Sequence, residues 1–239
     1  MKNNAVFVVG TGTDVGKTYV SAVLVNTLKN RGINVGYYKP VSSGNERING
    51  KLIAADAEFV KRFANLEEDS ADMISFAFEE SASPHFASRR DRNFVNLDVI
   101  KKDFESKCGK YEFVIVEGCG GIICPLMLEN KMEIWQEDLI ATLDLPVIVV
   151  ADSNLGAINA TCLTISYLKS KSMNILGIIL NNFDRENKIH QDNCNVIMRK
   201  TGINIIENIA ENQCILIDDS AISDIIHLIK NVTVSQHLY

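Results

Sequence analysis

The stretch GTGTDVGKT, from Gly10 to Thr18, has the residue types needed to bind a phosphate group. It joins an apolar, strand-like run to a segment with helical spacing, so backbone N–H groups and the positive end of the helix dipole can face an anion. There Lys17 reaches the outer phosphates and Thr18 ligates magnesium. The spacing is unusual, because five residues separate Gly10 from Gly16 and three separate Gly12 from Gly16, whereas the common loop has four.

Two further charged residues end apolar runs. YEFVIVEGCGG places Glu117 at a strand end, where phosphate-loop enzymes hold a second magnesium-coordinating carboxylate, often Asp. VGYYKPVSSG places Lys39 before Pro40, where a lysine can stabilise charge on a transferring phosphoryl group. Taken singly, a turn carboxylate and a surface lysine explain these residues equally well. Together they indicate phosphoryl-transfer chemistry, since both lie at the same edge of one predicted sheet.

Short apolar runs alternate with amphipathic segments of helical length. Strands are expected at Ala5–Val9, Val35–Lys39, Phe113–Glu117, Val147–Ala151 and Ile175–Leu180. Helices are expected at Lys17–Asn30, Ala54–Phe63, Glu133–Leu143, Ala157–Ser170, His190–Lys200 and Ile222–Asn231, and a loop at Ser43–Lys51. Because parallel strands need helical crossovers, the alternation predicts one α/β domain over residues 1–239: a single doubly wound, mostly parallel sheet with helices on both faces.

Composition argues against several other classes of protein. The 239 residues carry a formal net charge of −6 at pH 7, which disfavours a general nucleic-acid surface. No window reaches the roughly 18 apolar residues of a membrane span, and the N-terminal apolar run is too short for a signal peptide. The six cysteines form no Cys-x-x-Cys or compact Cys/His cluster, so neither a zinc site nor a disulfide framework is indicated. We therefore expect a cytoplasmic, unprocessed protein with no nucleic-acid or membrane partner.

Six segments carry a resemblance to a known family. In order and spacing, GTGTDVGKT, KPVSSG, AADAEF, SPH, VEGCGG and NLGAIN resemble dethiobiotin synthetase, the ATP-dependent carboxylase of biotin synthesis. The longer glycine loop is that family's form of the motif. The resemblance covers about Val6 to Asn182, and its motifs are specific as a set rather than one by one.

The resemblance implies a reaction and an assembly. Carbon dioxide joins 7,8-diaminopelargonate as a carbamate, ATP phosphorylates the carbamate, and the neighbouring amine closes the ureido ring as ADP and phosphate leave. Mg²⁺ is the implied cofactor. A homodimer is implied as well, in which the helix start at Leu155, Gly156 and Ala157 receives the substrate carboxylate across the interface. Free N–H groups at that helix start would form an anion site; an ordinary helix start within one subunit is the alternative.

The resemblance also implies roles residue by residue. Lys17 and Lys39 are the implied catalytic residues, holding the phosphates and the carbamate, and Thr13 and Ser43 bind the substrate. The implied magnesium ligands are Thr18, Asp56 and Glu117. The implied ATP contacts are Asp14, Val15, Gly16, Lys17, Thr18, Tyr19, Asp56, Glu117, Gly118, Cys119, Gly120, Asn181 and Asn182. The two asparagines match where the family holds adenine, and a cap or turn before Asp184 explains them equally well.

The sequence departs from the family at three places. Cys119 stands where alanine is usual, and packing is expected for it rather than a redox role. After Ile209 the segment IAENQ replaces a proline-containing turn, so the use of Ile209–Glu211 near the nucleotide stays open. His85 lies in a family motif and receives no catalytic role.

Two other functions fit parts of the sequence. A nucleotide-switch ATPase of the partition or division-site type shares the expected sheet, but its loop usually carries a lysine where Thr11 stands here. The C-terminal stretch ISDIIHLIKNV could mimic the membrane helix of such proteins; a core-packing amphipathic helix fits its few basic residues better. A small-metabolite kinase would need arginines on a mobile lid, and SRRDRN supplies Arg89, Arg90 and Arg92, which a solvated loop explains equally well.

Overall fold

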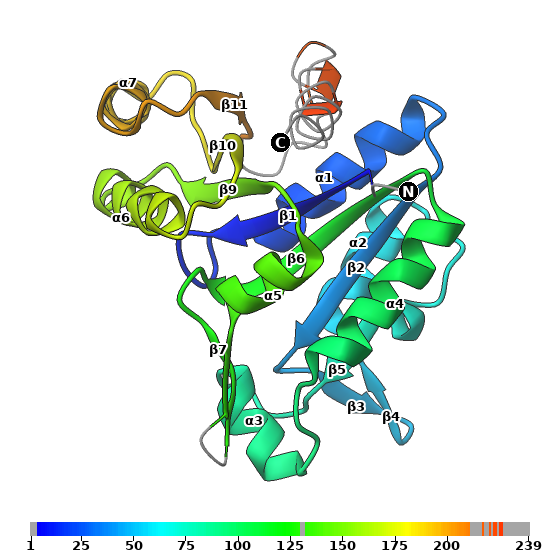
Figure 1. Cartoon of the computed structure of the whole chain (residues 1–239). Coiled ribbons are helices and arrows are strands. Elements are labelled where there is room, and N and C mark those ends of the chain that lie inside the picture. Colours follow the sequence, from blue (N-terminus) through cyan, green and yellow to red (C-terminus); the bar gives the residue numbers. More distant parts are fainter. Residues whose placement is uncertain are drawn as a thin grey trace, which may run out of the picture.

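A computed structural model describes residues 4–129 and 132–210, together with residues 217, 220, 222, 223, 225 and 226. Strands and helices alternate along the chain (Figure 1). The strands are β1 Ala5–Gly10, β2 Val35–Ser42, β3 Glu46–Ile48, β4 Lys51–Ile53, β5 Ile74–Ala77, β6 Phe113–Gly121, β7 Pro125–Glu129, β8 Met132–Trp135, β9 Val147–Asp152, β10 Ile175–Asn181 and β11 Ile205–Asn208. The helices are α1 Lys17–Asn30, α2 Ala55–Phe63, a 3₁₀ turn at Ser70–Met73, α3 Pro84–Asp91, α4 Leu97–Lys110, α5 Gln136–Leu143, α6 Ala157–Ser170 and α7 Lys188–Thr201.

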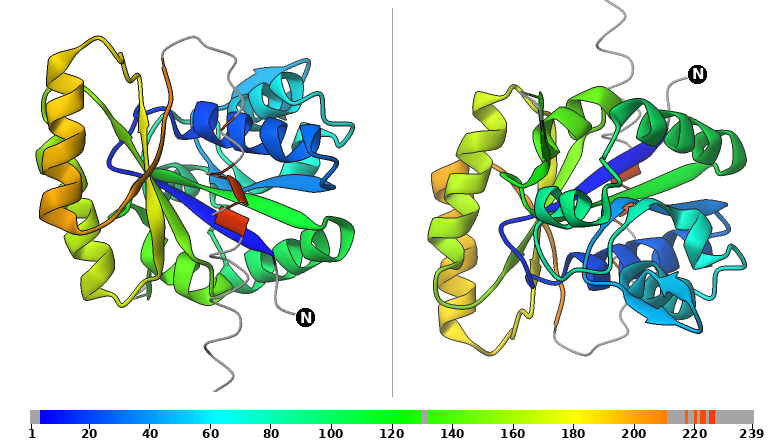
Figure 2. Two further views of the ribbon diagram at one scale, coloured as in Figure 1. Left: turned by 90° about the horizontal axis from the view of Figure 1, so that it is seen from above. Right: turned by 90° about the horizontal axis from the view of Figure 1, so that it is seen from below.

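Seven of these strands form one sheet, in the order β11-β10-β9-β1-β6-β2-β5, and every neighbouring pair is parallel. Figure 2 shows helices on both of its faces, with α1 on one side and α4 on the other. Side chains of β1 alternate between two cores, since Val6 and Val8 pack with α1 and α2 while Phe7 and Val9 pack with α4, α5 and α6. The predicted fold class is confirmed, and its five predicted strands are the central ones.

The alternation of side chains along β6 carries a carboxylate to the α1 face. Phe113 and Ile115 pack in the core beneath α1 and α2, so Glu117, two residues further on, points to the same side. Next to it in β2, Tyr38 lies opposite Val116, which brings Lys39 level with Glu117. Both strands run past these two residues, to Gly121 and Ser42, so the pair lies inside the sheet rather than at its rim.

Two expected elements differ from the observed ones. The helix expected at Glu133–Leu143 begins only at Gln136, because Met132–Trp135 forms strand β8, which pairs antiparallel with β7. The loop expected at Ser43–Lys51 contains strand β3 and the turn of the β3–β4 hairpin. That turn has positive φ at Asn49 (51°) and Gly50 (81°), the conformation that an Asn-Gly pair favours in a two-residue hairpin.

Helices α3 and α4 and strands β5 and β11 were not predicted. Helix α4 nevertheless has a local signal, because the Asn96 side chain accepts hydrogen bonds from the N–H groups of Asp98 (2.8 Å) and Val99 (3.2 Å). The first two arginines of SRRDRN, Arg89 and Arg90, lie in α3 rather than in a loop, and Arg92 follows directly after the helix. There Arg89 pairs with Glu129 and Arg90 with Glu80, which leaves neither of these two as a free lid residue.

The helix predicted at Ile222–Asn231 lies largely outside the described residues. Residues 222, 223, 225 and 226 are helical, and Ile222 and Ile225 are buried in the core shared with α1. At these positions the packing interpretation of the C-terminal stretch is the one that the structure supports. In the part of the chain that the structure describes, no helix is both long and apolar enough to span a membrane.

Candidate active site

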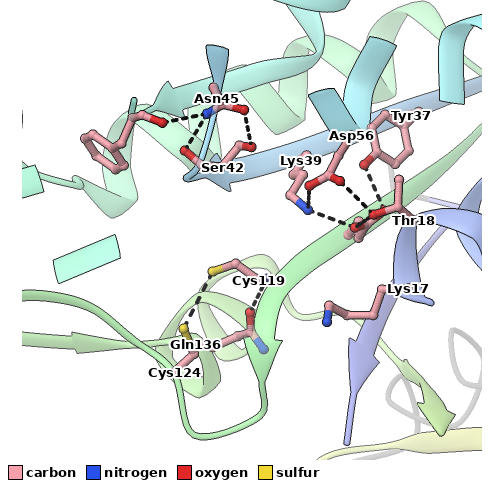
Figure 3. A network of polar contacts seen from close by, with 12 residues as sticks. Lys17, Thr18, Tyr37, Lys39, Ser42, Asn45, Asp56, Cys119, Cys124 and Gln136 are labelled. Atoms are coloured by element: carbon pink, nitrogen blue, oxygen red, sulfur yellow. Dashed lines mark hydrogen bonds and ion pairs between the residues drawn. The ribbon is translucent and has the colours of Figure 1, made fainter. Parts of the chain in front are cut away.

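A polar network lies near the carboxyl-terminal ends of β2 and β6, with Thr18, Tyr37, Lys39 and Asp56 labelled in Figure 3. At its centre lies Glu117. Its side chain is fully buried (0% exposed). Tyr37 donates a hydrogen bond to Oε2 (2.8 Å), and Lys39 Nζ lies 2.8 Å from Oε1. Thr18, in the first turn of α1, brings its hydroxyl to 2.8 Å from the same Oε1. Strands β2 and β6 and helix α1 therefore all contribute to this one carboxylate.

Asp56 completes the network from the first turn of α2. Lys39 forms an ion pair with it, and the Thr18 hydroxyl lies 3.0 Å from Asp56 Oδ1. A hydroxyl has one hydrogen, so Thr18 serves one of the two carboxylates at a time. Residues that lie far apart in the sequence thus converge on one point, as the resemblance implied for Thr18, Asp56 and Glu117.

The lysines of the site have opposite electrostatic situations. Burial disfavours the charge on Lys39, but Glu117 and Asp56 outweigh it and raise the pKa of Lys39 above the ordinary lysine value. Burial lowers the pKa of Lys17, and Glu117 offsets only part of that effect. Burial also opposes ionisation of Asp56, yet Lys39 and the Thr18 hydrogen bond hold the pKa of Asp56 below its usual range. Lys39 is already paired, whereas Lys17 would gain from a bound anion.

The phosphate loop has the backbone that its glycines suggest. Gly16 has φ +89° and begins α1 without a side-chain cap, so the first N–H groups of the helix face outward unclaimed by a capping side chain. Lys17 folds back and donates to the Gly12 carbonyl (2.9 Å). A Cβ at Gly10 would lie 2.8 Å from that same carbonyl oxygen. The loop between Gly10 and Gly16 accommodates the extra residue. Within this loop Asp14 has a positive φ of 59°.

The structure separates the two asparagines at the end of β10, of which Asn181 is the last residue of the strand and Asn182 follows it. Asn181 is buried and donates from Nδ2 to the Val15 carbonyl (3.2 Å), while its Oδ1 has no hydrogen-bond partner among the described residues. Asn182 points elsewhere, donating to Asp152 Oδ1 (3.0 Å) at the end of β9. Asn154 also donates to Asp152. Of the predicted pair, Asn181 adjoins the phosphate loop and Asn182 fixes the segment that leads to α6.

The remaining predicted residues lie around this network. Thr13 and Asp14 are exposed on the phosphate loop, and Ser43 is partly exposed just after β2. The Tyr19 ring packs edge-on against Phe63 of α2, with 5.8 Å between ring centroids.

At the start of α6, Gly156 has φ +95° and Leu155 is 99% exposed, while Ala157 is buried. His85 Nδ1 is 2.9 Å from the Ser83 hydroxyl at the start of α3, which is consistent with a structural role.

Sequence reasoning missed Tyr37 and Gln136. Tyr37 had a signal, since it lies two residues before Lys39 and therefore on the same face of β2. Gln136 had none: its Oε1 accepts from the Cys119 N–H (2.7 Å) and its Nε2 donates to the Gly121 carbonyl (2.9 Å). A Cβ at Gly118 would lie 2.5 Å from Gln136 Oε1, so the segment after Glu117 is held closely against α5.

Known proteins are similar to this chain in sequence. The family model described as an AAA domain matches residues 4–214. The ATP-dependent dethiobiotin synthetase of Clostridium botulinum (strain Loch Maree / Type A3) is 47% identical over 188 residues, covering 79% of this chain and 82% of the relative. This chain belongs to the ATP-dependent dethiobiotin synthetase family. A second dethiobiotin synthetase, from Brachyspira hyodysenteriae, is 41% identical over 202 residues, 84% of this chain and 90% of the relative.

Solved structures of other proteins resemble this member of the dethiobiotin synthetase family in their fold. A ParA family ATPase from Chlorobium tepidum superposes with a TM-score of 0.54 at 14% identity, over 99% of this chain and 94% of that chain. The MinD cell division protein of Aquifex aeolicus gives 0.53 at 16% identity, over 96% and 97%. At such identities the likeness shows the fold alone. A nucleotide switch is therefore not inferred, and Thr11 still stands where the switch loop carries lysine.

The lowered pKa of Asp56 predicts how stability depends on pH. Its carboxyl stays ionised to lower pH in the folded chain than in the unfolded chain, so its contribution is present above about pH 4 and is lost as the pH falls through the lowered value. We expect Asp56→Asn to be less stable than the parent at pH 7, with a gap that narrows at pH 3. Urea unfolding of both proteins at the two pH values measures this. A gap of equal size at both would contradict the assigned pairing with Lys39.

Proposed function

We propose that this protein is a dethiobiotin synthetase, a ligase that forms carbon–nitrogen bonds. It joins carbon dioxide to 7,8-diaminopelargonate with ATP and Mg²⁺ and releases dethiobiotin, ADP and phosphate. The supporting observation is the convergence of Thr18, Lys39, Asp56 and Glu117 in one polar network near the carboxyl-terminal ends of β2 and β6, in a chain of this family. Lys17 lies within electrostatic reach of Glu117. We place the reaction in the cytoplasm, on small molecules, without a nucleic-acid or membrane partner.

The chemistry needs positioned charge more than a reactive side chain. One amine of the substrate adds to carbon dioxide, and the carbamate oxygen attacks the γ-phosphorus as ADP departs. The second amine then attacks the carbonyl carbon of the carbamic-phosphoric anhydride, and phosphate leaves as the ring closes. Negative charge builds up on the phosphoryl group, and we assign its neutralisation to Lys17 and Lys39.

The oxygen ligands at the site fit magnesium. Thr18, Asp56 and Glu117 offer hydroxyl and carboxylate oxygens, and Mg²⁺ is usually held by one or two carboxylates together with substrate phosphates. When bound, the ion would neutralise phosphate charge. Lys39 holds both carboxylates here, so it must release at least one of them when a cation binds.

For the adenine we propose Asn181. Its Oδ1 is buried without a partner among the described residues, and an amide oxygen can accept a hydrogen bond from the amino group of a purine. Its Nδ2 is fixed on the Val15 carbonyl, which orients the amide. Asn182 would act indirectly, through Asp152.

For the substrate we propose Thr13 and Ser43 within one chain and Leu155, Gly156 and Ala157 of a second chain in a homodimer. The apolar Leu155 side chain is 99% exposed in the single chain, and a Cβ at Gly156 would have no atom within 4 Å. That helix start has no side-chain cap, and an uncapped helix start suits a carboxylate. The Ala157 N–H donates to the Asn154 carbonyl (3.0 Å), so a carboxylate would have to share or displace that bond.

The substrate requirement for ADP release tests the function. We expect release only when diaminopelargonate and bicarbonate are present together, because the carbamate that they form is the phosphoryl acceptor. A coupled assay for ADP, with each compound added singly and then both, measures this. ATP turnover without either compound, raised by lipid or DNA, would instead favour a nucleotide switch.

Substitution of the two lysines tests the charge assignment. Lys17→Ala and Lys39→Ala should each lower turnover on the order of 10²-fold or more, about 3 kcal/mol. Arginine at either position should restore only part of the loss, since a planar guanidinium does not replace a compact ammonium. Lys101→Ala, at an exposed position of α4, is the control. A Lys39→Ala enzyme within about twofold of the parent would remove Lys39 from the mechanism.

Mixing of two inactive variants tests the shared site. Lys39→Ala chains and Gly156→Asp chains are each expected to be inactive. In the second variant the aspartate carboxylate would lie where the substrate carboxylate is proposed to bind, and the two like charges repel. Random reassociation makes half of the dimers mixed, each with one undamaged site of two, so activity should return to about a quarter of the parent.

Gly156→Asn is the matched control for the mixing experiment. Asparagine accepts the positive φ of Gly156 as aspartate does but carries no charge. It should therefore retain more activity than Gly156→Asp. Verified subunit exchange without any recovery of activity would show that each site lies within one chain.

A further inference from the structure

Two thiols lie against each other beside the phosphate loop. Cys119 lies near the end of strand β6. Its Sγ is 3.8 Å from Sγ of Cys124, which precedes β7 (Figure 3). Cys119 is partly exposed and Cys124 is buried. Among the described cysteines, Cys108, Cys162 and Cys194 have no such thiol neighbour.

The backbone around the pair holds the two sulfurs together. Gln136 accepts from the Cys119 N–H (2.7 Å), and its own N–H donates to the Cys124 carbonyl (3.0 Å). Between the cysteines the chain reverses through Gly120, which has φ +58°. A disulfide needs the sulfurs about 2.05 Å apart, so they must approach by less than about 2 Å, which needs side-chain rotation together with a shift of the short backbone segment between the two cysteines.

We propose that Cys119 and Cys124 form a reversible intramolecular disulfide that weakens nucleotide binding. The oxidant is a low-molecular-weight disulfide. Cys119, the less buried of the two residues, attacks it through Sγ, loses its proton to water and expels one thiolate, which gives a mixed disulfide. Cys124 Sγ then attacks Cys119 Sγ, loses its proton and expels the second thiolate. Two protein thiols are oxidised and one external disulfide is reduced to two thiols.

The effect on the nucleotide follows from what this segment touches. Gly121 pairs with Gly10 across β6 and β1, and a Cβ at Gly121 would lie 3.5 Å from Gly12 Cα. A Cβ at Gly120 would lie 4.0 Å from the Thr13 hydroxyl. Drawing the sulfurs together therefore shifts residues packed directly on the phosphate loop. Disulfides in cytosolic proteins are usually transient and redox-sensing, which suits a reversible bond here.

Mass spectrometry tests bond formation. The tryptic peptide 111–131 contains both cysteines and no other. After treatment with oxidised glutathione and alkylation, this peptide should be unalkylated and about 2 Da lighter than its dithiol form. In Cys124→Ala the same peptide should keep a glutathione adduct on Cys119, because the resolving thiol is missing. A persistent adduct on Cys119 in the parent protein, or two alkylated cysteines, would overturn the proposal.

Titration with a fluorescent ADP analogue tests the consequence. The oxidised protein should bind it on the order of 10-fold more weakly, since displacements near 1 Å at such sites carry effects of this size or more. Dithiothreitol should restore affinity, and Cys162→Ala, which keeps the pair, should respond as the parent does. Circular dichroism before and after oxidation should show an unchanged fold. Unchanged affinity in protein with a verified disulfide, or a loss that dithiothreitol does not reverse, would overturn the link to the nucleotide site.

Discussion

The structure depends on how one buried carboxylate, Glu117, is satisfied. An ionised carboxyl without water costs several kcal/mol unless opposite charge and hydrogen bonds surround it. Here Lys39 supplies the charge, and the hydroxyls of Tyr37 and Thr18 reach its oxygens. Those partners come from β2 and α1, so the parallel register of β2 beside β6 and the position of α1 over the sheet are both constrained by this contact. The start of α2 joins them through Asp56.

The same contacts decide how the two lysines of the site are paired. Lys39 is fully engaged by carboxylates, whereas Lys17 is buried against a backbone carbonyl and its pKa is lowered. An anion at the start of α1 would supply the counter-charge that Lys17 lacks, and a cation on the carboxylates would release Lys39 toward that anion. Under the proposed function, binding would therefore exchange internal partners for ligand partners, so that the buried charges would be paired in both states.

Fold and function separate clearly in this molecule. The parallel sheet with α1 after the phosphate loop is shared with ParA and MinD proteins, although sequence identity to them is only 14–16%. The site of this chain is built from local features: Thr11 in the loop, Lys39 on β2 and the Gln136-bound segment after Glu117. Chemistry on a common fold is set by such side chains rather than by strand order.

The sequence by itself determined the phosphate loop and the central strands. Loop conformation follows from glycines and neighbours a few residues away, and strands buried on both faces show as continuous apolar runs. The edge strands β5 and β11 are too short to give such a signal. Only the tertiary structure decided that Tyr37 reaches Glu117, that Asn181 and Asn182 point to different partners, and that Cys119 meets a second thiol. These contacts depend on strand order, register and the path of each turn, which join residues up to 166 positions apart. The local pattern places Tyr37 on the face of β2 that carries Lys39, but it does not say which strand lies beside that face.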